Sequence, residues 1–485
     1  MANATGGARL KPGAFGPDRR RRRSPIVTAC GTLLSIMDGM HGPLHRKTTH
    51  GPARTALALR LLCGLIVQLL GTPAWPQAET NPAAQVPTGQ PSGVLGPSVS
   101  RWLDPARAPF LPVPLIGVDP DSGTTLGLLP VRLQTDEHND IRRIIAPDVL
   151  HNPYFGFGTD ARVYDYPSED TQWSIVAGIK QRVERGIDAE YQGGRLREQT
   201  LSINGSLVFQ RSGVSRFYGI GNETPMADQT NYTTQQELAQ AQIGLNLSHA
   251  WQALYTGRIQ VVDVLPGTLT GIPTLQSRFG QVIGLGTTEQ LLNRVSIAYD
   301  TRDNVTAPSR GVEWAVYTGR ANRLSLFHEA MYTEVGVDGR NFWPIVPDTI
   351  LATHVSLRYL PTTHDVPFWA LSSIGGEQAQ IGGEQPLRGY GIGRFYDRDS
   401  FSATAELRHK LATFNAVSSH IELELAPFVD VGRVFSQSST FPLTKLHPVG
   451  GLGIRGIARP FVVGYVDLGY GHEGLAVFTG INYPF

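Results

Sequence analysis

Hydrophobic and polar residues alternate along many short segments of this chain from about residue 115 onward. In residues 401–408 the odd positions are apolar and the even positions are Ser, Thr, Glu and Arg, and residues 294–297 and 421–425 repeat the alternation. Successive side chains of a β-strand point to opposite faces, so each segment predicts a strand with one apolar and one polar face. Turn residues separate the segments, which indicates an all-β protein.

Two all-β architectures share this pattern. A soluble sandwich buries its apolar faces, whereas a membrane barrel turns them to lipid and keeps the polar faces in its lumen. We favour a transmembrane antiparallel β-barrel, because a secretory leader precedes the alternating region and because that region contains no cysteine and no sign of a second domain. At roughly 23 residues per strand and connection, residues 115–485 predict about sixteen strands.

The composition narrows the class of protein further. Only 17% of the 485 residues are charged and 54 are Gly. A disordered polyelectrolyte is therefore excluded, because it needs low hydrophobicity and high net charge. A polytopic helical membrane protein is also excluded, because a spanning helix needs about 18 consecutive apolar residues. The longest apolar region, residues 55–72, is interrupted by Arg60 and Gln68.

The first 78 residues are predicted to be a targeting segment. An apolar run at Leu61–Leu70 follows basic residues and precedes small residues that end at Ala78, which is the order of a secretory signal. The leader is long, so translation could start at Met37 or Met40. A membrane anchor is the alternative, and a lipoprotein signal at Cys63 is disfavoured because no small residue precedes it.

The charge of the mature region differs from the net charge of +1 of the whole chain. Residues 1–78 hold 11 Lys/Arg and 2 Asp/Glu, so subtraction from 42 and 41 leaves 31 basic and 39 acidic residues, a balance of −8. Both cysteines, Cys30 and Cys63, also lie in this leader. The rest of the chain can therefore form no disulfide or thiolate metal site, and its charge does not favour nucleic acid as a partner.

A proline-rich stretch separates the leader from the alternating region. Ten prolines occur between Pro73 and Pro114, which predicts a periplasmic linker over residues 79–114. The predicted organisation is thus a targeting segment (1–78), this linker, and an outer-membrane barrel (115–485).

Four motifs occur in the barrel region. They are residues 299–304 (YDTRDN), 382–390 (GGEQPLRGY, followed by GRF at 393–395), 428–432 (FVDVG) and 480–485 (GINYPF). In this order and spacing they resemble the bacterial surface antigen family, the BamA/TamA-type superfamily of outer-membrane insertases and polypeptide transporters. Residues 217–222 (FYGIGN) are similar to a further part of its barrel.

The resemblance implies a loop folded into the barrel lumen. Its tip would be Leu387, Arg388, Gly389 and Tyr390, and Arg388 would reach Asp430 on a neighbouring strand. The residues agree with this, because Gly389 permits a tight turn and Asp430 has the parity of the polar face. A guanidinium also matches a carboxylate as a two-pronged donor.

The C-terminus is similar to the sorting signal of outer-membrane barrels. Gly480, Tyr483 and Phe485 match its glycine and two aromatic positions. Phe478 departs from the pattern, because a polar residue usually stands there. An ordinary core strand that ends in an aromatic residue is the alternative.

The function implied by the resemblance is outer-membrane protein assembly or polypeptide transport. The stretch between Ala78 and Leu115 is too short for the periplasmic POTRA modules of that superfamily. The partners that the resemblance implies are outer-membrane lipid and client or partner outer-membrane or periplasmic proteins. A passive pore is the alternative. An outer-membrane phospholipase using His354 and Ser356 is less favoured, because no third group is identifiable; we expect no enzyme activity, cofactor or metal.

Overall fold

The computed structural model describes residues 111–119, 121–138, 140–324, 329–377, 387–416, 419–436, 443–458 and 462–481. The predicted leader and all but the end of the predicted linker lie outside these residues. In the described part, no helix has the length and apolar character that crossing a membrane would need.

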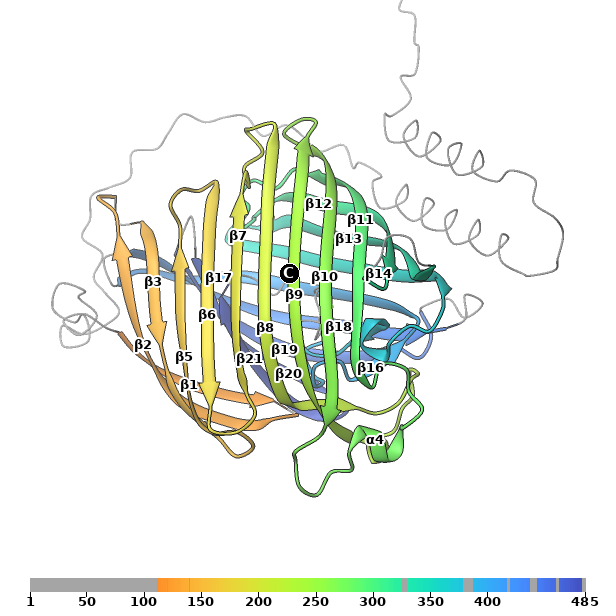
Figure 1. Cartoon of the computed structure of the whole chain (residues 1–485). Coiled ribbons are helices and arrows are strands. Elements are labelled where there is room, and N and C mark those ends of the chain that lie inside the picture. Colours follow the sequence, from red (N-terminus) through yellow and green to blue (C-terminus); the bar gives the residue numbers. More distant parts are fainter. Residues whose placement is uncertain are drawn as a thin grey trace, which may run out of the picture. The chain divides into compact units, whose positions relative to one another are not determined.

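Long antiparallel strands make up the wall of the molecule (Figure 1). They are β1 (Leu111–Asp119), β2 (Gly123–Thr135), β3 (Ile141–Pro147), β4 (Val149–Asn152), β5 (Gly156–Asp165), β6 (Thr171–Lys180), β7 (Arg185–Gly193), β8 (Leu201–Phe217), β9 (Thr230–Asn246), β10 (Trp251–Pro266), β11 (Gly286–Asp300), β12 (Gly311–Asn322), β13 (Ala330–Val346), β14 (Thr349–Thr363), β17 (Asp399–Ala416), β18 (Ser419–Phe435), β19 (His447–Ala458), β20 (Val462–Gly471) and β21 (Gly474–Ile481).

Apart from β3 and β4, each strand of the wall pairs with the next one in this list, and β1 pairs with β21, so the sheet closes into a barrel. β3 and β4 lie end to end between β2 and β5, and the barrel therefore has eighteen strand positions. The all-β barrel is confirmed, with eighteen positions where the sequence predicted about sixteen. The estimate was low because several connections are short, such as the two-residue turn 347–348 between β13 and β14.

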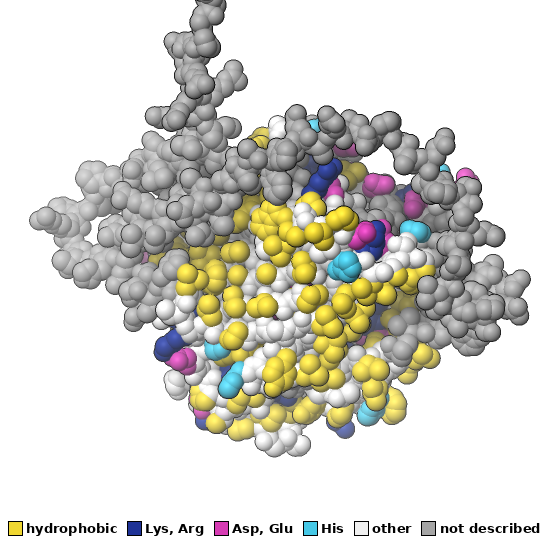
Figure 2. All heavy atoms as spheres, turned by 180° about the vertical axis from the view of Figure 1, so that it is seen from behind, with side chains coloured by type: hydrophobic (Ala, Val, Ile, Leu, Met, Phe, Trp, Pro, Cys, Tyr) yellow, Lys and Arg dark blue, Asp and Glu magenta, His cyan; other side chains and the backbone are white. Residues whose placement is uncertain are grey.

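The alternation of the sequence corresponds to the two faces of this wall. Leu407 and Val429 are 42% and 55% exposed on the outer face, whereas Glu406 and Asp430, their neighbours in sequence, are buried inside. Figure 2 shows many hydrophobic side chains on the part of the outer wall that is visible from this side. Apolar side chains outside and charged side chains inside are the arrangement of a barrel in lipid.

The two rims of the barrel differ in the length of their connections. At the rim where β21 ends, here called the terminal rim, the connections are short, such as residues 166–170 and 247–250. At the opposite rim, called the loop rim, residues 267–285 and 364–398 form long loops. Outer-membrane barrels have short periplasmic turns and long extracellular loops, so the terminal rim is the periplasmic one.

The long loops carry the remaining elements. The short helices are η1 (Met226–Asp228), α4 (Leu275–Arg278) and η2 (Phe368–Ala370), and the short strands β15 (Ser372–Ile374) and β16 (Phe395–Asp397) pair with each other. An aromatic cluster joins these loops to the wall at the loop rim. In it the Phe368 ring lies 4.8 Å from that of Phe217 and 5.5 Å from that of Tyr232, centroid to centroid.

The seam between β1 and β21 closes the barrel at a single pair among the described residues, Val118 with Val477. β1 begins at Leu111, so it starts inside the stretch that the sequence assigned to the linker, and it contains Pro112 and Pro114. Pro112 lies opposite Pro130 of β2. Neither can donate a backbone hydrogen bond, so this is a non-hydrogen-bonded pair. The backbone nitrogens of Pro112 and Pro114, which share parity, therefore point to the seam, where they provide no donor.

Candidate functional site

The described parts of the loop between β14 and β17 fold into the lumen; of the predicted segment 382–394, residues 382–386 lie outside the described residues. Its described tip is Leu387–Tyr390, and the Leu387 and Tyr390 side chains are buried. The Leu387 N–H donates to the carbonyl of Gly376 (2.8 Å), and the Gly376 N–H donates to the carbonyl of Tyr390 (3.1 Å). These backbone bonds tie the tip to Gly376, two residues after β15 ends, and so fix its conformation.

Arg388 and Asp430 are in direct contact. Nε and Nη2 of Arg388 donate to the two carboxylate oxygens of Asp430 at 2.9 and 2.8 Å, and the Arg388 backbone N–H adds a third bond at 3.0 Å. The guanidinium also lies 3.5 Å above the centre of the Phe428 ring. The sequence predicted this pair from its motifs, and the structure shows the two-pronged geometry that a lysine could not reproduce.

The pair belongs to a larger buried cluster, here called the arginine cluster. Nη1 of Arg388 donates to Glu406 and Asp467, both at 2.6 Å. Arg455 contacts the same two carboxylates, and Arg408 donates to Glu406 at 2.9 Å. With Asp430, three arginines face three carboxylates, and all six side chains are fully buried. The cluster is therefore electrically balanced without solvent.

Glycines let the loop approach the wall closely enough for these bonds. A Cβ on Gly469 of β20 would lie 1.6 Å from the carbonyl oxygen of Arg388, and a Cβ on Gly389 would lie 2.5 Å from the backbone nitrogen of Gly471. Neither clash could be relieved by moving a side chain, because both contacts are to backbone atoms. The loop tip thus docks backbone to backbone on β20.

Arg394, in the GRF part of the motif, is a second anchor of the loop. Its Nε donates to Glu473 (2.7 Å) and its Nη2 donates to the carbonyl of Thr224 (2.7 Å). The guanidinium lies 3.9 Å from the centre of the Tyr218 ring. Arg394 therefore joins the connection between β8 and β9 to the connection between β20 and β21, across the barrel.

The 217–222 segment contributes to the same region. The Asn222 side chain accepts the backbone N–H of Val434 (3.0 Å) and donates to the carbonyl of Lys445 (2.9 Å). His447 stacks on Phe395 at 3.9 Å between ring centroids and bonds the Asn222 carbonyl. Two of the sequence motifs, far apart in the chain, thus meet beside the inward loop.

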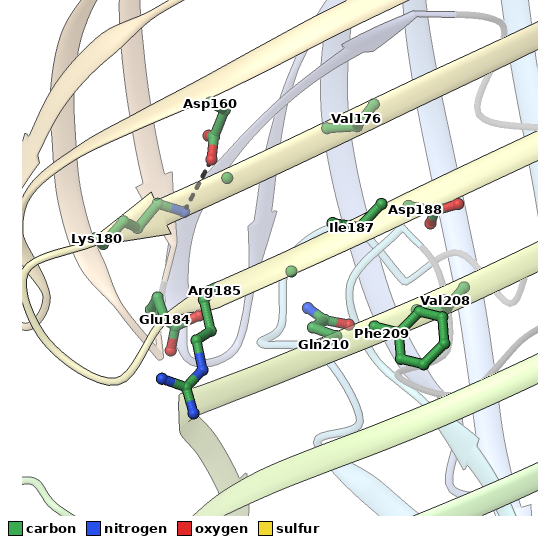
Figure 3. Close-up of a pocket in the computed structure, with 12 residues that line it drawn as sticks. Asp160, Val176, Lys180, Glu184, Arg185, Ile187, Asp188, Val208, Phe209 and Gln210 are labelled. Atoms are coloured by element: carbon green, nitrogen blue, oxygen red, sulfur yellow. Dashed lines mark ion pairs between the residues drawn. The ribbon is translucent and has the colours of Figure 1, made fainter.

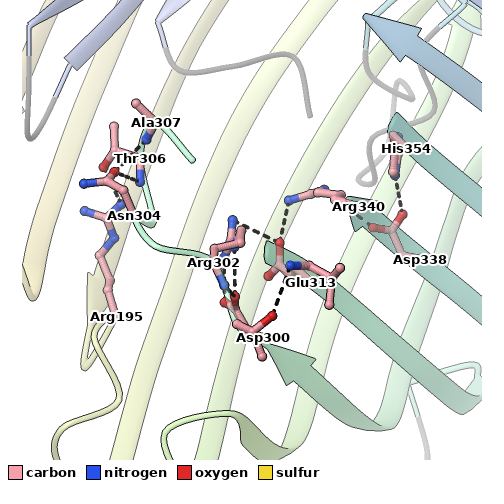
Figure 4. A network of polar contacts seen from close by, with 12 residues as sticks. Arg195, Asp300, Arg302, Asn304, Thr306, Ala307, Glu313, Asp338, Arg340 and His354 are labelled. Carbon is pink, nitrogen blue, oxygen red and sulfur yellow. Dashed lines mark hydrogen bonds and ion pairs between the residues drawn. The ribbon is translucent and has the colours of Figure 1, made fainter. Parts of the chain in front are cut away.

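The 299–304 motif forms a turn at the terminal rim (Figure 4). Arg302 donates from Nη2 to Asp300 at 2.8 Å and from Nη1 to Glu313 at 3.1 Å. Asn304 accepts the backbone N–H groups of Thr306 and Ala307 at 2.8 and 2.7 Å. These side chains satisfy the backbone of the turn, so the motif has a structural role here.

The predicted sorting signal lies only partly within the described residues. Gly480 pairs with Tyr465 of β20, and a Cβ at Gly480 would lie 2.5 Å from the Tyr465 hydroxyl. Phe478, which departs from the signal, is buried. Tyr483 and Phe485 lie outside the described residues, so a sorting role for this motif stays a prediction.

The sequence also singled out His354 and Ser356. His354 Nε2 lies 2.8 Å from an Asp338 carboxylate oxygen, and the Ser356 side chain bonds the same aspartate. Asp338 thus stands between the two residues, whereas in a catalytic triad the histidine takes that place. In the described part of the chain, no group of His, Cys, Asp and Glu side chains is arranged to hold a metal ion.

A recess of about 330 Å³ lies in the wall between β5 and β8 (Figure 3). Gly178 and Gly186 are opposite each other on β6 and β7 there, and Lys180 and Asp160 face one another at 3.8 Å. The paired glycines add no side chain to the wall at this point, and Glu184 and Arg185 also line the recess.

Sequence reasoning missed most of the arginine cluster. Glu406 and Arg408 were placed on a polar face, but no motif connected them to Arg388. Arg455 and Asp467 stand alone among glycines and apolar residues, and only the register of β19 against β20 brings them together. A charged residue isolated in an apolar strand was the available signal, because such a charge must find a partner inside.

Comparison with known families agrees with this architecture. The model of the Omp85 superfamily domain matches residues 173–454, more than half of the chain. The chain belongs to the Omp85 superfamily. The predicted resemblance to the BamA/TamA-type barrels and the outer-membrane location are thereby confirmed.

Three solved structures align with much of the chain at low sequence identity. BamA from Haemophilus ducreyi lacking POTRA domains 1–3 aligns with a TM-score of 0.44 at 12% identity, over 73% of this chain and 74% of that one. CdiB from Acinetobacter baumannii aligns at 0.43 and 14% identity, over 77% and 65% of the two chains. CdiB from Escherichia coli aligns at 0.43 and 12% identity, over 76% and 67%. No curated protein sequence matches the chain significantly.

Proposed function

We propose that this Omp85 barrel assembles outer-membrane proteins or transports polypeptides by pairing client strands at the β1–β21 seam. The supporting observation is the weak pairing of this seam, with one residue pair among the described residues. Pro112 and Pro114 supply no donors to it. Unpaired strand edges template other strands, so a seam that opens offers a client strand a backbone partner.

The inward loop complements the seam in this proposal. It docks on β17, β18 and β20 through the arginine cluster, close to the C-terminal side of the seam. It therefore holds the last strands rigid while the donor-poor edge of β1 is free to separate. A barrel that is firm everywhere except at one seam opens at that seam.

The experiment locks the seam covalently. Val118→Cys and Val477→Cys are opposite each other, and a disulfide or a short bismaleimide bridge between them prevents opening. The locked protein should fold normally but leave cells with less folded outer-membrane protein, or less exported polypeptide, than the reduced protein. The matched control bridges Leu468→Cys to Val477→Cys, a pair inside the closed sheet.

Unchanged outer-membrane protein levels with the locked seam would refute the proposal. Equal losses from the seam bridge and from the control bridge would also refute it, because the effect would then come from the crosslink and not from the seam.

We propose no hydrolytic role for His354 and Ser356, because Asp338 occupies the middle position between them. Phospholipid hydrolysis by the purified barrel that Ser356→Ala abolishes would overturn this.

A further inference from the structure

The lumen contains a cavity of about 720 Å³ beneath the inward loop. Its wall comes from β7 to β14, and Trp369 to Leu371 and Tyr396, at the two ends of the inward loop, close it on one side. This volume lies within the range of pockets that bind small molecules, about 300–1,000 Å³. The arginine cluster, on β17 to β20, is not part of its lining.

Three arginines meet on one side of this cavity. Arg294 and Arg358 donate from Nε to the two oxygens of Glu334, at 2.7 and 3.0 Å. Arg258 lies opposite Leu292 on the neighbouring strand, two residues from Arg294, so the two arginines are diagonal neighbours on one face, within reach of long side chains. Glu334 itself is fully buried.

The donors of these arginines exceed the acceptors that the protein supplies. Among the described residues, Arg258 makes one hydrogen bond, from Nε to Gln240 (2.8 Å), and no ion pair. Arg294 also makes one hydrogen bond, from Nε to Glu334. In contrast, both η nitrogens of Arg358 donate to the carbonyl of Ala370. The η nitrogens of Arg258 and Arg294 thus remain as donors at the lining of the cavity.

The charge on this side is positive. Arg294 and Arg358 engage both oxygens of Glu334, and Arg258 has no carboxylate partner among the described residues. The other acidic side chains of the lining do not neutralise Arg258 and Arg294. Asp338 contacts His354 and Arg340. Asp188 and Glu190 lie on β7, three strands from Arg258, which is about 14 Å at the usual spacing of strands. An anion placed between Arg258 and Arg294 therefore meets cations first.

Uncharged hydrogen-bonding groups surround the arginines. Gln240, Gln242 and Gln290 line the cavity, and Gln290 is held by the Tyr332 hydroxyl at 3.1 Å. Gln236 also lines it; its side chain is 7% exposed and its Oε1 has no partner. Side-chain amides both donate and accept, so this lining suits a ligand that bears several hydroxyl groups.

We propose that this cavity binds a phosphorylated solute of sugar-phosphate size, with its phosphate between Arg258 and Arg294 and its hydroxyls on the glutamines. Guanidinium groups match phosphate oxygens as two-pronged donors. The ligand is a soluble molecule, because the lining is too polar for a lipid chain. This inference is independent of the seam and of client handling.

The test is calorimetric titration of the purified full-length barrel, in non-ionic detergent at low ionic strength. The probes are glucose 1-phosphate, inorganic phosphate and glucose. Glucose 1-phosphate should bind best, inorganic phosphate more weakly, and glucose not measurably. Arg258→Gln should weaken glucose 1-phosphate binding by at least about tenfold, because a hydrogen bond to a charged group is lost. The affinity of Arg258→Lys should fall between those of the unmodified barrel and Arg258→Gln.

The matched control is Arg278→Gln, which removes an arginine that pairs with Asp228 on the loop rim, outside the cavity. It should bind glucose 1-phosphate as the unmodified barrel does. If Arg258→Gln fails to fold, the salt dependence of the unmodified barrel decides, because binding to arginines weakens as ionic strength rises. No binding at millimolar glucose 1-phosphate, equal binding of glucose, or unchanged affinity in Arg258→Gln would overturn the proposal.

Discussion

At the scale of single residues, the arginine cluster determines how the inward loop is held. Its six charged side chains are fully buried, so each has lost its hydration. The attraction of a buried pair offsets that loss only when the geometry is good, and here two-pronged contacts and shared carboxylates supply it. The cluster therefore tolerates the loss of a single member poorly.

Arg388→Ala and Asp430→Ala should each destabilise the folded barrel by about 3–5 kcal/mol, because each leaves buried charges without a partner. The double variant should lose less than the sum, since the two residues share the interaction. Urea unfolding in detergent measures these free energies. Arg142→Ala is the control; its pair with Asp136 is partly exposed and should cost about 0–1 kcal/mol. Additive losses would contradict a direct coupling.

Glu377, in the inward loop, should make loop docking depend on pH. Burial raises the pKa of its carboxyl to about 7, with a contribution from Asp467, although Tyr465 donates a 2.8 Å hydrogen bond to it. The folded state thus holds the proton more tightly than the unfolded state, whose pKa is near 4.5. The protonated Glu377 carboxyl therefore stabilises the docked loop fully below about pH 4.5. This stabilisation is lost as the pH rises through 7, and the loss is at most about 3 kcal/mol.

Proteolysis of the loop at about pH 5.5 and pH 8.5 measures this effect. Cleavage of the unmodified loop should be faster at the higher pH, and Glu377→Gln, which cannot ionise, should remove most of the difference. An equal pH response in both proteins would show that another group is responsible.

At the scale of elements, the alternation predicted both the strands and their inner and outer faces. It worked because lipid and lumen impose opposite demands on successive residues. Pairings across strands were harder to foresee. Arg388 and Asp430 were predicted because two motifs named them, whereas Arg455 and Asp467 depend on a strand register that local sequence does not encode.

The proline edge of β1 makes a prediction for the seam. Pro112→Val with Pro114→Val restores two backbone donors on the edge of β1 that faces the seam, each worth about 0.5–1.5 kcal/mol if bonded. Hydrogen exchange of β21 should slow and client handling should fall. Pro130→Val is the control, since its backbone nitrogen points away from β1. Unchanged exchange in the double variant would mean that the prolines do not limit seam pairing.

The last strand makes a further prediction, which rests on the Gly480, Tyr483 and Phe485 pattern. Phe485→Asp should sharply lower the amount of folded barrel without lowering synthesis, because the sorting signal is altered. The folded fraction is measured by faster migration of unboiled samples on gels. Leu443→Asp, an equivalent change at an exposed loop-rim position, should assemble normally. Normal assembly of Phe485→Asp would exclude a sorting role.

At the scale of the whole molecule, the inward loop and the aromatic cluster occupy the lumen at the loop rim. Single-channel conductance of the purified barrel should therefore be small, and Arg388→Ala, which frees the loop tip, should raise it. Arg278→Ala, outside the lumen, should leave it unchanged. A large, steady conductance of the unmodified barrel would favour the passive pore over assembly or transport.

The order of the anchors along the chain has a consequence for biogenesis. Arg388 bonds to residues 18, 42 and 79 positions further along, in β17, β18 and β20. The loop can therefore lock only after nearly all of the barrel has emerged and paired, and long-range contacts of this kind form late. A chain cut short before β20 would keep its loop undocked and accessible to periplasmic proteases. Docking of the loop would thus distinguish a finished barrel from an unfinished one.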